Sequence, residues 1–268
     1  MTATADYEYR GLMAEAWDLL RGDTSGWGDR AWFKTVIGRG GGPALDVGCG
    51  TGRLLLDYLT AGLDVDGVDN SPEMLALCRP KAEAVGIDVA GRLHLGEMQS
   101  LALPRRYATI FVPSLSFMLL PDLADAKAAL AAFHAHLVPG GQLALSFRTM
   151  PMWDGPGPAP PDGEWSEWIV ESKATRPDGA RVRRWWRARF HEGPQLVDEV
   201  FRYEVIEDGV VTRSEEQGHV PTLRWYTLDQ ALALMADAGF TDLIATSDSS
   251  FEPATQADGR FKIVGKRA

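Results

Sequence analysis

The chain has 268 residues, of which 45% are hydrophobic and 24% are charged, as is typical of a soluble globular protein with one large domain or a domain carrying an insertion. The net charge of −10 argues against a nucleic-acid groove, since phosphate binding depends on lysine and arginine, and it disfavours an anionic membrane surface. A small molecule or an amine-bearing partner is therefore the expected ligand.

The sequence also lacks the marks of membrane insertion, export and metal binding. No stretch approaches the roughly 20 apolar residues of a membrane span, and the first residues have neither the basic nor the apolar region of a secretory signal. Two cysteines, Cys49 and Cys78, form no disulfide framework, and no His/Cys cluster has ligand spacing. We expect a cytoplasmic protein without a metal site.

Apolar segments alternate with helical patterns from residue 43 to 150, which predicts a parallel sheet wrapped by helices. Ser71 followed by Pro72 is a predicted helix start. The predicted strands are 43–48, 64–69, 92–97, 107–114 and 142–147, and two further predicted helices are 52–62 and 122–137.

A loop rich in proline and glycine, at 151–164, ends this alternation of strands and helices. Alternating patterns then predict an antiparallel sheet inserted after the fifth strand, with strands over 165–176, 181–191, 195–207 and 210–226. A helix over 227–238, with Thr227 as N-cap, and strands over 243–250 and 261–267 would complete the first sheet. The expected organisation is a helical lid segment (1–36), a Rossmann-like core (37–150), an inserted sheet that covers a small-molecule site or forms a homodimer surface (151–226), and a return to the core (227–268).

The segment DVGCGTG (46–52) lies between a predicted strand and a predicted helix. Its alternate glycines allow a sharp turn and let a ligand touch the main chain, as a dinucleotide or phosphate loop also would. Asp46 before the glycines can pair with an ammonium group and would repel a pyrophosphate. Asp69 ends the next strand, where a carboxylate can accept both hydroxyls of a ribose. Each acid could instead be a turn or helix-cap residue.

The segments ALDVGCGTGRLLLDYL, VDGVDNSPEMLALCRPKA and LVPGGQLALSF resemble motifs of the class I S-adenosylmethionine-dependent methyltransferases. The resemblance implies an α/β, Rossmann-like fold and S-adenosylmethionine as cofactor. It implies that Gly48, Cys49 and Gly50 line the methionine and ribose, and that Asp69 holds the ribose hydroxyls. It further places Asn70 and Met74 beside the adenine, Glu97 and Met98 near the adenine amino group, where the family more often has Asp, and Ser114 where the methyl group emerges.

The inserted sheet and the stretch HVPTLRWY (219–226) resemble small-molecule N-methyltransferases, notably sugar N,N-dimethyltransferases and glycine N-methyltransferase. We therefore expect methyl transfer to a nitrogen or oxygen of a small-molecule acceptor, with His219, Tyr226 and Arg224 as candidate catalytic residues. Two alternatives are a cofactor-binding protein that transfers no methyl group and a nicotinamide-dependent oxidoreductase, against which Asp46 argues.

Two features of the insertion have both a functional and a structural interpretation. Its tryptophans could form a wall for an apolar or cationic acceptor, or could simply cover one face of a thin sheet. Arginines at alternate positions could bind an anionic substrate, or could form a solvated face paired across the strands. The tryptophans are Trp153, Trp165, Trp168, Trp185, Trp186 and Trp225; the arginines are Arg181, Arg183, Arg187 and Arg189, and their expected acidic partners are Asp198, Glu199 and Glu204.

Overall fold

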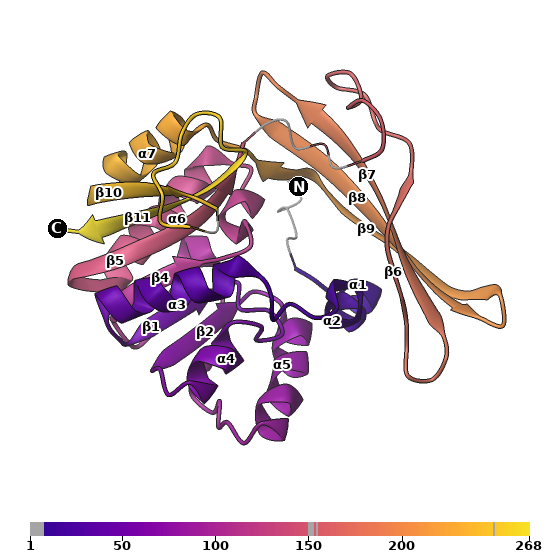
Figure 1. Cartoon of the computed structure of the whole chain (residues 1–268), viewed down its shortest axis with the longest axis horizontal. Coiled ribbons are helices and arrows are strands. Elements are labelled where there is room, and N and C mark those ends of the chain that lie inside the picture. Colours follow the sequence, from indigo (N-terminus) through magenta and orange to yellow (C-terminus); the bar gives the residue numbers. More distant parts are fainter. Residues whose placement is uncertain (1–7, 150–152, 154, 249) are drawn as a thin grey trace. The chain divides into compact units, whose positions relative to one another are not determined.

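The computed structural model describes residues 8–149, 153, 155–248 and 250–268, which form two compact units (Figure 1). The α/β unit contains the described residues of 25–149 and 225–268, and the inserted-sheet unit contains those of 8–24 and 153–224. The predicted α/β fold with an antiparallel insertion is confirmed. The predicted lid segment 1–36 divides at residue 24, because the helix that follows packs in the core of the α/β unit.

The α/β unit is built on a seven-stranded sheet with the order β10-β11-β5-β4-β1-β2-β3. The neighbouring strands from β5 to β3 are parallel, and β11 runs antiparallel to both β5 and β10. Its strands are β1 (Ala44–Val47), β2 (Val65–Asp69), β3 (Leu93–Leu95), β4 (Tyr107–Val112), β5 (Leu137–Arg148), β10 (Phe240–Ser247) and β11 (Arg260–Arg267). All four residues of β1 are buried, as expected of a central parallel strand.

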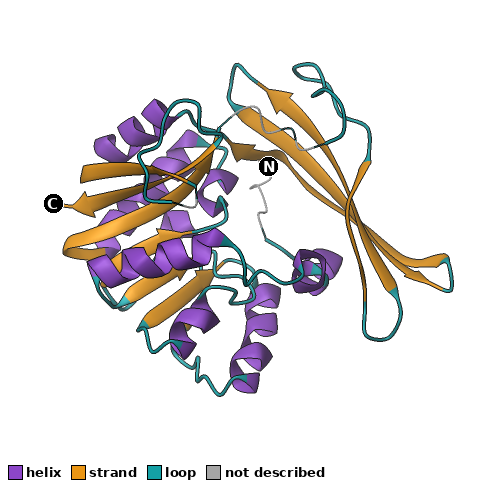
Figure 2. Ribbon diagram, viewed as in Figure 1, coloured by secondary structure: helices purple, strands orange, loops and turns teal. Residues whose placement is uncertain are grey.

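Helices cover both faces of this sheet (Figure 2). They are α3 (Gly28–Gly40), α4 (Leu55–Thr60), α5 (Pro72–Ala84), α6 (Leu123–His136) and α7 (Leu228–Asp237), with short 3-10 helices η1 (Met98–Ser100) and η2 (Ser116–Leu119). The first three helices share one apolar cluster with the strands, in which Trp32, Phe33, Tyr58, Leu75 and Phe111 are buried.

Both predicted N-caps are confirmed. The Ser71 hydroxyl accepts the Met74 backbone N–H at 3.1 Å, and Thr227 forms a reciprocal capping box with Gln230.

Some element boundaries differ from the prediction for local reasons. The helix predicted from residue 52 begins at Leu55, because Gly52 has φ +87°, outside the range of a right-handed helix. The strand predicted over 142–147 already begins at Leu137, which pairs with Tyr107 before an irregularity in the register. The strand predicted over 243–250 is β10, which begins at Phe240 and ends at Ser247.

The inserted-sheet unit has the antiparallel order β6-β7-β8-β9. Its elements are α1 (Gly11–Glu15), α2 (Trp17–Arg21), β6 (Ile169–Thr175), β7 (Arg181–His191), β8 (Leu196–Glu207) and β9 (Val210–Arg224). Leu12 and Met13 of α1 pack against Val182, Tyr203 and Val205 on one face of the sheet. The helix is fastened there because Glu215 of β9 accepts the Leu12 backbone N–H at 2.8 Å.

Two of the four arginines expected to form a paired face of β7 bond acids across the strands, whereas Arg181 and Arg187 lie opposite Ile206 and Val200. Arg183 bonds Glu204 at 2.7 Å, and Arg189 bonds Asp198 at 2.6 Å, each to its cross-strand partner. The expectation that Glu199 joins them is wrong. Glu199 is the cross-strand partner of Ala188, and because side chains alternate along a strand it lies on the opposite face from the arginines.

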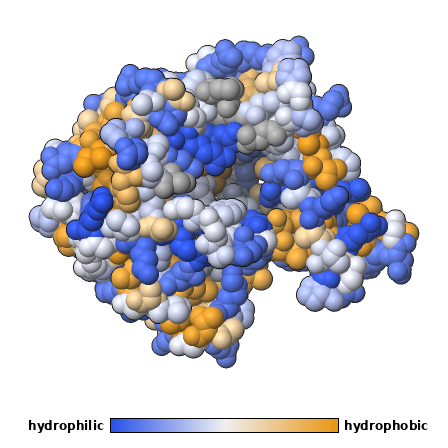
Figure 3. Space-filling view, in the orientation of Figure 1, coloured by the Kyte–Doolittle hydropathy of each residue, from blue (hydrophilic) through white to orange (hydrophobic). Residues whose placement is uncertain are grey.

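No helix in the described ranges is both long and apolar enough to cross a membrane. The exposed large apolar side chains of the α/β unit come from separate elements, among them Val85, Leu95, Leu123 and Ile244. Figure 3 accordingly shows apolar residues scattered among polar ones over the visible face of this unit.

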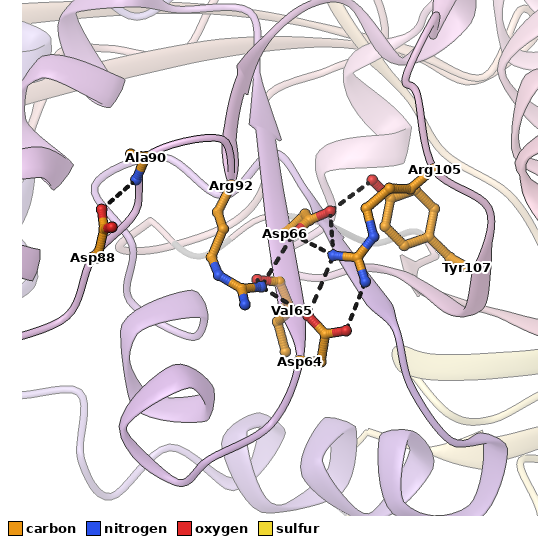
Figure 4. A network of polar contacts seen from close by, with 8 residues as sticks. All are labelled: Asp64, Val65, Asp66, Asp88, Ala90, Arg92, Arg105 and Tyr107. Atoms are coloured by element: carbon orange, nitrogen blue, oxygen red, sulfur yellow. Dashed lines mark hydrogen bonds and ion pairs between the residues drawn. The ribbon is translucent and has the colours of Figure 1, made fainter.

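The amino-terminal edge of the parallel strands is held by a network around Asp66, whose side chain is fully buried (Figure 4). Asp66 accepts hydrogen bonds from Arg105 at 3.0 Å, Arg92 at 3.3 Å and the Tyr107 hydroxyl at 3.0 Å. Both arginines also bond Asp64, and their hydrogen bonds lower the pKa of that half-exposed carboxyl to about 2. The network joins β2 and β4 to the segments that precede β3 and β4.

Replacing Asp66 by Ala should lower the free energy of unfolding by roughly 3 kcal/mol, because it removes the buried acceptor that these three donors share. Asp64→Ala is the matched control, since its carboxylate is 46% exposed and its removal should cost less than about 1 kcal/mol. Urea denaturation followed by circular dichroism measures both values. Equal losses in the two variants would contradict the central role of Asp66.

Candidate functional site

The glycine loop lies between β1 and α4, at the carboxyl end of the parallel strands. The backbone N–H groups of Gly48 and Cys49 donate to the Val68 carbonyl at 2.8 and 3.1 Å, so the loop is bound to the end of β2. Gly48 and Gly50 have φ values of +73° and +55°, which side-chain-bearing residues rarely adopt. A Cβ atom added to Gly48 would lie 3.0 Å from the Ser116 hydroxyl, so the close approach also requires glycine there. The backbone conformation and the packing of the loop therefore require glycine at these positions.

Asp69 is the last residue of β2, beside this loop. Its two carboxylate oxygens accept the Gly50 N–H at 2.8 Å and the Ser71 N–H at 2.9 Å. Burial raises the pKa of Asp69, and these two hydrogen bonds oppose that rise. Since each carboxylate oxygen can accept two hydrogen bonds, both retain capacity for the hydroxyls of a ribose.

Asp46 of β1 is only 1% exposed, and its Oδ1 atom has no hydrogen-bond partner among the described residues. Burial raises the pKa of this carboxyl to about 8, while the Arg53 guanidinium and a hydrogen bond from the Leu55 N–H act in the opposite direction. A buried acceptor without a donor is unfavourable, so a ligand that brings a donor to this oxygen gains binding energy. An ammonium group of the cofactor fits that requirement.

The remaining cofactor candidates follow the ends of β2, β3 and β4. Asn70 is the residue after Asp69, and Met74 is buried in the first turn of α5, where its Cε atom would lie 3.2 Å from a Cβ on Gly50. Glu97 is exposed just before η1 and accepts the Gln99 amide at 3.1 Å, and Met98 begins η1. The structure thus places Asn70 and Met74 at the glycine loop, and Glu97 and Met98 after the neighbouring strand.

An ion pair that the sequence pattern did not indicate lies beside this loop. Arg53, the residue after the last glycine, bonds both carboxylate oxygens of Asp29 at 3.0 and 2.5 Å, and it also donates to the Ser114 hydroxyl at 3.2 Å. Its guanidinium lies 5.0 Å from the centre of the Trp27 ring. The position of Arg53 next to the motif is a signal that could have found it, whereas no local pattern indicates Asp29 as its partner.

The three candidate catalytic residues are distributed over both units. His219 and Arg224 belong to β9, where His219 is the cross-strand partner of Glu199 and Arg224 donates to the Pro194 carbonyl at 2.8 Å. Tyr226 belongs to the α/β unit, where its ring packs 5.7 Å from Phe147. Their common role stays a prediction.

Comparison with known proteins identifies residues 44–141 as a methyltransferase domain. The dTDP-3-amino-3,6-dideoxy-alpha-D-glucopyranose N,N-dimethyltransferase of Streptomyces fradiae is 31% identical over 158 residues, which are 57% of this chain and 58% of that enzyme. The match therefore spans little more than half the length of this relative.

Solved structures resemble nearly the whole chain. The S-adenosylmethionine-bound amino pentose methyltransferase CalS10 of Micromonospora echinaspora is 26% identical, with a TM-score of 0.64 over 97% of this chain and 98% of that one. The methyltransferase CcbJ of Streptomyces caelestis, 19% identical, has the same fold, with a TM-score of 0.74 over 98% of this chain and 99% of that one. Residues 44–141 therefore form a methyltransferase domain, and the chain as a whole has the fold of S-adenosylmethionine-dependent methyltransferases.

Proposed function

We propose that this protein transfers the methyl group of S-adenosylmethionine to an amine nitrogen of a small molecule, with an amino sugar as the favoured acceptor class. The proposal rests on two acids near the ends of the neighbouring strands β1 and β2. The buried Oδ1 atom of Asp46 has no hydrogen-bond donor among the described residues, and the Asp69 carboxylate is held beside the glycine loop. The choice of nitrogen is supported by the amino sugar methyltransferases among its relatives.

In this proposal the residues around the glycine loop hold the cofactor. Asp46 pairs with the ammonium group, the main chain of the loop lies against the methionine and ribose, and Asp69 accepts the ribose hydroxyls. The proposed contacts of the loop are Gly48, Cys49 and Gly50; those near the adenine are Asn70, Met74, Glu97 and Met98; and Ser114 is placed where the methyl group emerges.

When bound, the cofactor supplies a methyl group on a sulfonium, whose departure leaves a neutral sulfide. The protein therefore mainly has to align the acceptor and exclude water. An amine acceptor reacts through a neutral lone pair, which needs no strong base near neutral pH. We therefore assign His219 to positioning the acceptor. Arg224 orients His219 or the acceptor, and Tyr226 is the third residue beside the acceptor.

The remaining expectations belong to the same proposal. The inserted-sheet unit would cover the acceptor or form a homodimer surface, and the net charge of −10 supports a small-molecule partner in place of a nucleic acid. Cys49 and Cys78 are buried and form no disulfide, which supports a reducing compartment such as the cytoplasm.

Replacing Asp69 by Ala should weaken cofactor binding at least about tenfold, because it removes two charge-assisted hydrogen bonds worth roughly 1.5–3 kcal/mol each. Asp88→Ala is the control, since Asp88 likewise accepts a backbone N–H, from Ala90 at 2.8 Å, but is exposed in another loop. Isothermal calorimetry with S-adenosylhomocysteine measures both affinities. Equal affinities in the two variants would remove Asp69 from the ribose site.

Cofactor affinity should rise with pH up to about 8, because the raised pKa keeps the Asp46 carboxyl protonated below that value and an ammonium group binds only the charged form. The affinity should fall by up to about tenfold per pH unit below 8, and binding should release a proton. For the same reason, the stability that the neutral carboxyl gives the free protein is lost as the pH rises through 8.

Calorimetry in buffers of different ionisation enthalpy measures the released proton. Asp46→Asn keeps the size of the side chain but cannot ionise, so its affinity should lose this pH dependence. A wild-type affinity that does not change from about pH 6 to pH 8 would contradict the assignment of Asp46.

Release of S-adenosylhomocysteine in the presence of amine compounds, and not of their hydroxyl counterparts, tests the reaction itself. His219→Ala should then act mainly on the Michaelis constant, as expected for a positioning residue. A loss of about 10²–10⁴-fold in kcat would indicate a general base and hence a hydroxyl acceptor. Binding without release for every acceptor would favour a protein that only binds the cofactor.

A further inference from the structure

The face of the inserted sheet opposite Arg183 and Arg189 is largely apolar. Its side chains on β7 and β8 are Val182, Arg184, Trp186, Ala188, Phe190, Val197, Glu199, Phe201, Tyr203 and Val205. At one end, α1 packs on Val182, Tyr203 and Val205. Trp186, Ala188 and Glu199 lie further along the strands, toward the other end of this face.

A carboxylate on an apolar face requires an explanation, because moving a charge away from water is costly. Asp198 and Glu204, which also belong to β8, lie on the polar face and bond arginines. Glu199 lies instead between the strand positions of Ala188 and His219, and it accepts a hydrogen bond from the Trp186 indole N–H at 3.0 Å. Glu199 is half-buried.

The backbone holds Glu199 and His219 opposite each other. The Glu199 N–H donates to the Thr222 hydroxyl at 2.7 Å, and that hydroxyl in turn donates to the His219 carbonyl. The register shifts between the pairs Val197–Leu223 and Glu199–His219, because three residues of β9 but only one residue of β8 lie between these pairs. Such bulges bend a strand and redirect its side chains.

Aromatic rings lie next to this acid. The rings of Trp153 and Trp186 are 5.4 Å apart and tilted by 31°, and Trp153 meets Phe190 edge-on at 6.3 Å. Trp186 is almost fully buried, so its indole N–H is held in place, and Trp153 is half-buried. A carboxylate beside indole rings is the combination that binds a cationic amine, by charge pairing and by cation–π attraction, while the rings contact the C–H groups of the same ligand.

We infer that Glu199, His219, Trp153 and Trp186 form a subsite of the inserted sheet that binds the protonated amine of the acceptor. The inference rests on the proposed function and extends it, since it names the group that recognises the acceptor. Glu199 pairs with the ammonium group as the acceptor binds and then accepts a proton from it, because only the neutral amine has the lone pair that attacks the methyl group. His219 contacts the same nitrogen or a neighbouring hydroxyl. The Trp153 ring contacts the carbon skeleton, and the Trp186 indole N–H holds Glu199 in place.

The test uses the full chain and two probes, 3-amino-3-deoxy-D-glucose and D-glucose, which differ only in the amine. Nitrogen-15 spectra resolve the indole N–H signals, and Trp186→Phe assigns that of Trp186. The amino sugar should shift the Trp186 signal more strongly than D-glucose does, and it should leave the Trp185 signal on the opposite face unmoved.

Glu199→Gln keeps an acceptor for the Trp186 N–H and removes the charge, so the amino sugar should bind about tenfold more weakly. Glu204→Gln is the matched control, because Glu204 accepts the Trp185 indole N–H at 2.8 Å in the same way on the other face. Its affinity for the probe should be unchanged. An amino sugar that leaves the Trp186 signal unmoved, or that binds the Glu199→Gln variant as tightly as the wild type, overturns the subsite.

The same samples separate this inference from the proposed function. Amine-dependent shifts that need Glu199, without S-adenosylhomocysteine release from any acceptor, would support the subsite and contradict methyl transfer. Methyl transfer to an amine with unaltered kinetics in Glu199→Gln would support the proposed function and overturn the subsite.

Discussion

The candidate site depends on the hydrogen bonds that bind the glycine loop to the end of β2. Gly48 and Cys49 both donate to the Val68 carbonyl, and Gly50 donates to the Asp69 carboxylate. Three consecutive N–H groups of the loop are thereby fixed to two consecutive residues of the neighbouring strand. Since these bonds require left-handed backbone at Gly48 and Gly50, the glycines are needed for the shape of the loop as well as for access to it.

The two ends of β2 hold their acidic residues in different ways. Asp66, near its amino end, is surrounded by Arg92, Arg105 and the Tyr107 hydroxyl. At the carboxyl end, Asp69 is held by backbone N–H groups, and burial raises its pKa. Acids that meet arginines at the amino edge strengthen the fold, whereas those at the carboxyl edge keep capacity for a ligand's donors. The carboxyl edge is also where ligands bind in open α/β sheets.

Features set by local sequence were predictable. The glycine loop, the helix start at Ser71 and the alternation of β7 depend on neighbouring residues, and the structure confirms them. The pairing of Arg53 with Asp29 and that of Arg105 with Asp66 were not predicted, because each joins segments far apart in the chain whose meeting depends on the packed fold.

The position of Glu199 shows a different limit of sequence patterns. Acids at 198, 199 and 204 all appeared able to pair with the arginines, yet which of them do so depends on the register between β7 and β8. A shift of one residue moves every side chain of a strand to the other face. Asp198 and Glu199 are neighbours in sequence, and only the register assigns one to the polar face and the other to the apolar face.

This alternation has a consequence for the proposed binding of the acceptor by the inserted sheet. The polar face of the inserted sheet is stabilised by the ion pairs Arg183–Glu204 and Arg189–Asp198, which use one set of strand positions. The residues of the apolar face, including Trp186 and Glu199, alternate along the strands with the residues of these ion pairs and make separate contacts. Side chains on the apolar face can therefore change without breaking those ion pairs. In the proposed function, such a sheet would change the small molecule that it binds while the glycine loop and Asp69, in the other unit, continued to hold the same cofactor.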